Sequence, residues 1–284
     1  MKHSLLIVIL LFVFFIPIFS QESDSIQKSD SLIMYVGRLN SLFSHIVSEE
    51  NDYNKSRMNN SIHNTIKEMS ENEDSFLWTM DSVRFIGKFV SSDLQMAMYT
   101  WIVPLSDNKF LYNAVFQSAD GDLWSLKNSK NTAETTDFPV SEKDWYGALY
   151  YEIIPFKSAD KEDLYLLLGW RKFADKQQKV IDILDISSGE IVLGKPLFEQ
   201  EVSIYGKKQM VSQNRVWFEY DTRVSMFMNY NEKKKRVELD NLSPMEVVDG
   251  QVLSYGPDFS VNAYQFKKGR WIFVDDIKVK NYAE

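Results

Sequence analysis

The pattern of apolar and polar positions changes its period near residue 76 of this chain. Before that point, apolar residues recur at the three- and four-residue spacing of a helix face, as Leu32, Val36, Leu39, Phe43 and Ile46 and again as Met58, Ile62, Ile66 and Met69. Residues 49–52 between the two runs are typical of a turn. We therefore predict a helical hairpin in segment 21–75, whose apolar stripe packs on the rest of the chain or on a partner.

From residue 76 onward, short runs rich in Val, Ile, Tyr, Phe and Trp alternate with turn residues, which is the pattern of β-strands. The strand candidates are 94–103, 110–116, 122–126, 145–154, 164–170, 180–186, 190–193, 216–220, 225–230, 236–239, 252–255, 261–266 and 270–274. The connections are short, and parallel pairs need long crossovers, so the sheets are expected to be antiparallel. The predicted fold is mainly β: a large antiparallel meander of sandwich or propeller-like sheets over 76–284, preceded by the helical hairpin.

Four glycines, Gly121, Gly189, Gly250 and Gly269, each precede one polar and two apolar residues, as expected where a tight turn re-enters a strand. Their irregular intervals do not establish a propeller repeat. The run Leu164–Leu168 is apolar at every position, which predicts a strand covered on both faces.

The segment Met1–Ser20 has the layout of a secretory signal peptide, with a basic start, an apolar run from Leu5 to Phe19 and a small residue at the expected cut. An uncleaved anchor is the alternative interpretation, although the apolar run is shorter than the about 20 residues of a membrane span. No other segment is long and apolar enough to span a bilayer. We therefore expect no membrane insertion after cleavage.

Composition narrows the compartment and the partners. The chain has no cysteine, which excludes a lipid-modified N-terminal Cys, thiol catalysis and Cys-ligated metal centres. Cleavage would therefore leave the protein periplasmic or secreted. The net charge of −8 argues against nucleic acid as a partner, because a surface of that sign repels phosphate backbones. The basic cluster Lys233–Arg236 follows Asn231 between two strand candidates, and we interpret it as a solvated hairpin turn.

Five short segments of the β region carry a resemblance to a known family. They are Asp144–Tyr151, Leu166–Trp170, Val180–Leu184, Gly194–Phe198 and Tyr255–Asp258. Together they resemble a family of exported bacterial proteins of unknown function, of the kind found in Bacteroidetes. The resemblance extends from about Asp93 to the C-terminus and implies a secreted, mainly β protein. It transfers no catalytic residue.

Few catalytic chemistries fit the remaining side chains. His3 belongs to the predicted signal, and His45 and His63 lie in the helical segment, which is weak support for a catalytic triad or a multi-histidine metal site. The P-loop, the dinucleotide fingerprint, the zinc-protease motif and the nucleophile elbow are all absent from the sequence. We therefore predict no catalytic residue, no metal and no cofactor.

Aromatic residues, 14% of the chain, offer the better functional candidates. Strict alternation in the predicted strand 144–152 places Tyr146, Tyr150 and Glu152 on one face, where they form either a ligand-binding surface or a second packed layer. The expected function is that of an exported, non-enzymatic binding protein whose partner is a protein or a glycan. The alternatives are a carbohydrate-active hydrolase that uses paired carboxylates and a structural part of an envelope assembly that docks through the helix stripe.

Overall fold

The computed structural model describes residues 19–128 and 137–278 of the 284-residue chain. The predicted signal Met1–Ser20 lies outside the described residues except for its last two positions. The predicted helical hairpin is confirmed: α1 (Phe19–Ser48) and α2 (Asp52–Ser70) are joined by residues 49–51. Asn51 caps α2 because its side-chain oxygen accepts hydrogen bonds from the N–H groups of Tyr53 and Asn54, which lack partners inside the helix.

The strands form three sheets. The first, sheet A, has the order β1-β2-β3-β4 and consists of β1 (Gly87–Val90), β2 (Met96–Pro104), β3 (Phe110–Ser118) and β4 (Leu123–Asn128). The predicted run 110–116 and the turn at Gly121 are both found in this antiparallel meander.

Sheet B has the order β5-β9-β8-β7-β6, and β12 also pairs with β8. Its strands are β5 (Val140–Ser141), β6 (Leu149–Lys157), β7 (Asp163–Lys172), β8 (Lys176–Asp185), β9 (Val192–Leu193) and β12 (Val216–Asp221). Strand β9 pairs with the last residues of β8, whereas β12 pairs with Lys176–Ile181. The two strands therefore share one edge of β8.

Sheet C has the order β11-β10-β16-β15-β14-β13. Its strands are β10 (Phe198–Ile204), β11 (Lys207–Gln213), β13 (Met228–Asn231), β14 (Arg236–Val248), β15 (Gln251–Lys267) and β16 (Arg270–Val274). Short 3₁₀ helices occur at η1 (Glu73–Ser75), η2 (Glu142–Asp144) and η3 (Glu232–Lys234). The helix η3 and Lys235, with φ of 49°, form the turn between β13 and β14, so the basic cluster lies at a hairpin turn as predicted.

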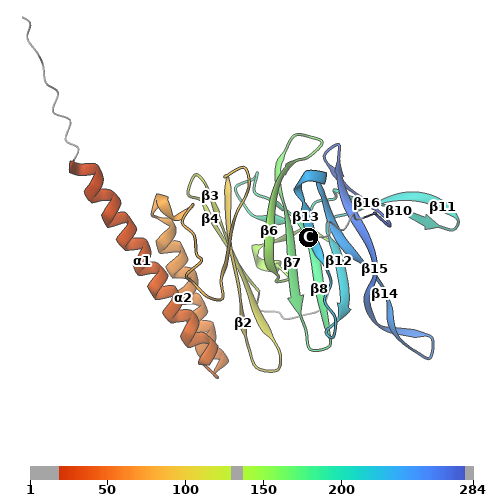
Figure 1. The fold of residues 1–284 in the computed structure, drawn as a ribbon, viewed down its shortest axis with the longest axis horizontal. Coiled ribbons are helices and arrows are strands. Elements are labelled where there is room, and N and C mark those ends of the chain that lie inside the picture. Colours follow the sequence, from red (N-terminus) through yellow and green to blue (C-terminus); the bar gives the residue numbers. More distant parts are fainter. Residues whose placement is uncertain (1–18, 129–136, 279–284) are drawn as a thin grey trace, which may run out of the picture.

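The layers stack in one direction, from the helices through sheets A and B to sheet C, as Figure 1 shows from left to right. One apolar layer lies between the helices and sheet A, a second between sheets A and B, and a third between sheets B and C. The helix stripe is buried against sheet A: Leu39, Phe43 and Ile66 are each at most 1% exposed. The stripe thus packs within the chain.

Strand β7 lies at the centre of the stack. Leu164, Leu166 and Leu168 face sheet C, whereas Tyr165 and Leu167 face sheet A, and all five are buried. The expected strand with two covered faces is therefore confirmed. Burying one such leucine contributes about 1.5–3 kcal/mol through the hydrophobic effect.

The structure differs from the predicted strands in four respects. The pair β10–β16 is parallel, which is possible because a long stretch of chain separates the two strands. The hairpin β10–β11 was not predicted, and the candidates 252–255 and 261–266 are parts of one strand, β15. Strand β6 begins at Leu149 instead of Trp145, because η2 and Gly147, with φ of 81°, interrupt the extended chain before it. Among the described residues, no helix has the length and apolar character that a membrane span requires.

Candidate functional site

A cavity of about 570 Å³ opens between sheets B and C. Its lining includes β12, which pairs with β8 in sheet B, and β10 and β11, the last two strands at one end of sheet C. The lining residues come from β10, β11, β12, β14, β15 and β16 and from Asp137. The volume lies within the range of about 300–1,000 Å³ that is common for small-molecule sites.

Two glutamines form the outer part of the cavity wall on sheet C. Phe198 pairs with Gln213 and Gln200 with Val211, and Phe198 belongs to the core between sheets B and C. Because paired residues share a face, Gln200 and Gln213 lie on the side that faces sheet B. Their side-chain amides make no hydrogen bond to the described part of the chain, so they are available to a ligand.

Tyr264 forms the deeper part of the wall. Its side chain is 2% exposed, lies in ring contact with Phe273 at 5.4 Å between centroids, and lines the cavity. Burial raises the pKa of the Tyr264 hydroxyl, so it is neutral. Among residues 19–128 and 137–278 the hydroxyl has no hydrogen-bond partner. The hydroxyl is not among the fully buried unpaired polar atoms of the described residues, so it is open to solvent in the cavity, where a ligand atom can take the place of water.

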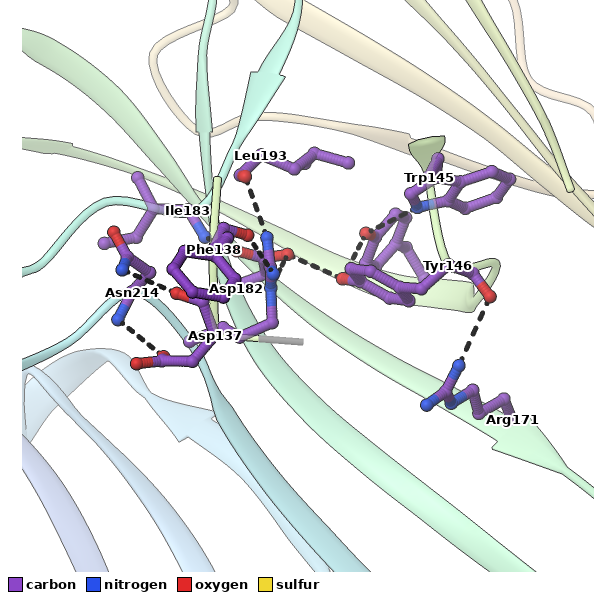
Figure 2. Close-up of polar contacts among 11 residues, drawn as sticks. Asp137, Phe138, Trp145, Tyr146, Arg171, Asp182, Ile183, Leu193 and Asn214 are labelled. Carbon is purple, nitrogen blue, oxygen red and sulfur yellow. Dashed lines mark hydrogen bonds and ion pairs between the residues drawn. The ribbon is translucent and has the colours of Figure 1, made fainter. Parts of the chain in front are cut away.

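The wall on sheet B is held by a buried ion pair. Arg215, which precedes β12 and lines the cavity, donates from Nε to Oδ2 of Asp182 on β8 at 3.0 Å, and both side chains are fully buried. Arg215 also donates from Nη1 to the Phe138 carbonyl at 2.7 Å and from Nη2 to the Leu193 carbonyl at 2.8 Å. Figure 2 shows these contacts around Asp182, with Phe138 and Leu193 on two sides.

Asp182 accepts two further hydrogen bonds. Tyr146 donates its hydroxyl to Oδ2 at 2.6 Å, and the Ile183 N–H donates to Oδ1 at 2.7 Å. Burial raises the pKa of Asp182, and the charge of Arg215 and these donors act in the opposite direction. Burial likewise lowers the pKa of Arg215, but the charge of Asp182 and the contact with Tyr146 outweigh it and leave the pKa above its ordinary value. The guanidinium therefore stays charged.

The network continues away from the cavity through aromatic side chains. The hydroxyls of Tyr146 and Tyr150 are 2.8 Å apart, and Trp145 Nε1 donates to the Tyr150 hydroxyl at 3.1 Å. Arg171 lies over the ring of Trp217 at 4.2 Å and donates to the Tyr146 carbonyl at 3.2 Å, as Figure 2 shows for Tyr146 and Arg171. These contacts fix the loop that carries Tyr146 and, through it, the position of Asp182.

Asp137, which lines the cavity, is bonded to Asn214. The Asn214 N–H donates to Asp137 Oδ1 at 3.0 Å, and the Asn214 side chain donates to the Asp137 carbonyl at 2.6 Å. Both residues are labelled in Figure 2. The ring of Phe138 is 79% exposed beside this contact.

Comparisons with known proteins give no relative. No protein-family model matches the chain, and no curated protein and no solved structure matches it.

The structure places the three sequence candidates in two different environments. Tyr146 and Tyr150 are buried in the polar network between sheets A and B, at 8% and 0% exposure. The expectation that Glu152 shares their face was wrong, because a β-bulge between Tyr150 and Glu152 shifts the register. Tyr151 and Glu152 consequently both contact β13, where Tyr151 donates to the Met228 carbonyl and Glu152 accepts from the Tyr230 N–H.

Glu152 lines a second cavity, of about 530 Å³, where the edge strands β1, β6 and β13 meet. Glu232 and Tyr230 also line it. Burial raises the pKa of the Glu152 carboxyl, and the hydrogen bond from the Tyr230 N–H partly opposes that effect. Within the described residues, no group of three or more acidic or histidine side chains could hold a metal ion.

Sequence reasoning missed Gln200, Gln213 and Tyr264, the residues that define the first cavity. A usable signal was present for Gln200, which precedes the turn at Tyr205-Gly206 and shares a strand face with Phe198 and Val202. No local signal identifies Tyr264, since an aromatic residue in a strand is most often a core residue.

Proposed function

We propose that this chain is an exported, non-enzymatic binding protein and that the cavity between sheets B and C holds its ligand. The observation that carries the proposal is Tyr264, a buried tyrosine that lines the cavity and whose hydroxyl has no hydrogen-bond partner among the described residues. The amides of Gln200 and Gln213 are uncommitted in the same cavity. Convergent polar groups of this kind are typical of a small-molecule site.

The buried ion pair supports the proposal because it makes the site rigid before a ligand arrives. Arg215 is held by Asp182 and by two backbone carbonyls, so the β12 wall cannot shift without breaking charge-assisted hydrogen bonds. A preorganised site loses less conformational entropy when it binds. The rigid wall therefore favours ligand binding.

The binding proposal is tested by a small-molecule fragment screen on the purified native protein, followed by backbone-amide NMR shifts. Fragments that bind should shift the amides of Gln200, Gln213 and Tyr264. The amide of Gln209, which lies on β11 but does not line the cavity, should stay unchanged. A screen in which no fragment moves the cavity amides would refute the proposal.

Export is proposed from the N-terminal pattern alone. Cleavage after Ser20 gives a mature chain that begins at Gln21. N-terminal sequencing of the native protein from a cell-envelope or culture-medium fraction tests this. A native chain that still begins at Met1 would contradict cleavage.

A hydrolase with paired carboxylates is a second candidate, supported by the cavity that Glu152 and Glu232 share. The raised pKa of Glu152 suits a general acid. The assay for this activity measures the release of reducing ends from oligosaccharides. Activity that is lost in Glu152→Gln and in Glu232→Gln would establish the hydrolase. The control Glu201→Gln, on the exposed hairpin, should keep the activity. The envelope-assembly alternative required a free helix stripe, and that stripe is buried against sheet A.

A further inference from the structure

On the basis of the proposed function, we infer that the cavity between sheets B and C takes a neutral saccharide. Three properties of the cavity lining support this ligand class: its hydrogen-bonding groups, its aromatic rings and its charge.

The free polar groups of the cavity match sugar hydroxyls. A hydroxyl is both a donor and an acceptor, and so are the Tyr264 hydroxyl and the side-chain amides of Gln200 and Gln213. Asn241 and Asn262 line the same cavity and are already bonded to each other at 2.9 Å, which fixes two more amides in place. A ligand with several hydroxyls can satisfy this set without carrying a charge.

Two partly buried rings lie on opposite walls. Phe218 belongs to β12 of sheet B, and Phe273 belongs to β16 of sheet C. The electron-rich face of an aromatic ring attracts the polarised C–H groups of a pyranose, which gather on the faces of the sugar ring. The hydroxyl-binding groups and the rings are therefore present together, as a saccharide requires.

The charges in the cavity disfavour anionic ligands. Asp137 and Asp240 both line it. The cation Arg215 is committed to Asp182 and to the carbonyls of Phe138 and Leu193. Phosphates and carboxylates would meet like charge and find no cation ready to bind them. Apolar ligands are disfavoured because they would leave Tyr264 and the glutamines unpaired.

Saturation-transfer difference NMR on the purified native protein tests the inference. The probes are maltotriose, cellotriose, mannotriose and chitotriose, with AMP as an anionic probe and spermidine as a cationic one. We expect signal transfer to the ring C–H protons of at least one saccharide, and none to AMP or spermidine.

Two mild variants connect binding to this cavity. Tyr264→Phe and Gln213→Ala should each weaken saccharide binding about three- to tenfold, the effect of losing one hydrogen bond. The control is Gln209→Ala. Gln209 lies on β11, as Gln213 does, but it does not line the cavity, so this variant should bind saccharide as the wild type does. Circular dichroism of each variant verifies that it is folded.

The outcomes separate the inference from the function on which it rests. If no saccharide binds while AMP, spermidine or a screened fragment shifts the NMR signals of the cavity amides, the ligand class is wrong and the binding function stands. If no compound shifts those amides, both are wrong. Saccharide binding that Tyr264→Phe and Gln213→Ala leave unchanged places the sugar elsewhere and overturns the inference.

Discussion

Arg215 Nε lies 3.0 Å from Asp182 Oδ2, and neither side chain has any solvent exposure. The pair ties the segment before β12 to the middle of β8, so one wall of the cavity is anchored to the central sheet. Removing two charges from water is costly, and the cost is offset here only because every donor of the network has a fixed acceptor.

Breaking this ion pair should strongly destabilise the protein. Asp182→Asn leaves the charge of Arg215 buried without a counter-charge, so we expect a loss of about 3–5 kcal/mol in the free energy of unfolding. Urea denaturation followed by tryptophan fluorescence measures it. The control is Glu201→Gln, which removes the exposed salt bridge to Lys208 and should cost less than about 1 kcal/mol. Equal losses in the two variants would contradict the assigned role.

A double variant tests whether the charges or the packing matter. Asp182→Leu with Arg215→Met replaces both charges by apolar groups of similar length, so it should be more stable than Asp182→Leu alone. A thermodynamic cycle over the two sites gives the coupling energy. A coupling near zero would show that the two side chains do not act together.

Acid should weaken the contact between the helices and sheet A through His63. His63 on α2 is 5% exposed and close to Asn113 and Trp101, and burial lowers its pKa to about 4. The unfolded chain therefore binds a proton below the ordinary histidine pKa of 6.5 while the folded chain does not, so stability falls as the pH drops from 6.5 to about 4. The expected loss is about 3 kcal/mol.

The free energy of unfolding, measured at pH 7 and at pH 4 for the wild type and two variants, checks the role of His63. His63→Gln has no titrating ring, so its loss between the two pH values should be smaller than that of the wild type. His45→Gln, on the exposed side of α1, should match the wild type. If His63→Gln loses as much as the wild type, carboxylates and not His63 cause the acid sensitivity.

Two turn glycines with the same conformation should differ in their tolerance of alanine. Gly250 and Gly269 have φ of 78° and 76°, but a Cβ at Gly250 would meet nothing within 4 Å, whereas one at Gly269 would lie 2.0 Å from the backbone N of Ala159. Gly250→Ala should cost about 1–2 kcal/mol for the left-handed conformation. Gly269→Ala should cost about 1–3 kcal/mol more, because the backbone at Ala159 must move. Thermal unfolding of both variants compares them, and equal losses would refute the predicted clash.

Lys88 should hold the segment after α2 in place. Its Nζ donates to the carbonyls of Ser75, Phe76 and Trp78 at 2.6–2.8 Å, and burial lowers its pKa to about 8. Lys88→Met keeps the apolar stem and leaves these carbonyls without the donor, so we expect a loss of at least about 2 kcal/mol. Hydrogen exchange of the amides in 73–83 should accelerate. The control Lys109→Met, at an exposed position, should leave the exchange rate of these amides unchanged.

Much of the architecture could be predicted from local periodicity. The stripe Leu39, Phe43 and Ile46 defines a helix face, and the continuous apolar run Leu164–Leu168 defines a strand covered on both sides. These features could be predicted because burial acts on each residue according to its position in a helix or strand, which the sequence pattern reports directly. The turn at Gly121 is local in the same sense, since it depends on backbone conformation.

The candidate site could not be predicted in this way. Tyr150 and Glu152 occupy positions that strict alternation places on one face, and the bulge at Tyr151 separates them. A bulge depends on the strand with which β6 pairs, and that pairing is not a property of residues 149–157 alone.

The sequence by itself determined the elements of this protein: a helical hairpin, many short strands and a central strand with two covered faces. Which residues line the cavity between sheets B and C depends on the tertiary structure. Asp182 and Arg215 are 33 residues apart, and Gln213 and Tyr264 come from strands at different positions of sheet C. The cavity is lined by β12 of sheet B and by β10, β11, β14, β15 and β16 of sheet C, so it arises from contacts between segments that are distant in the sequence.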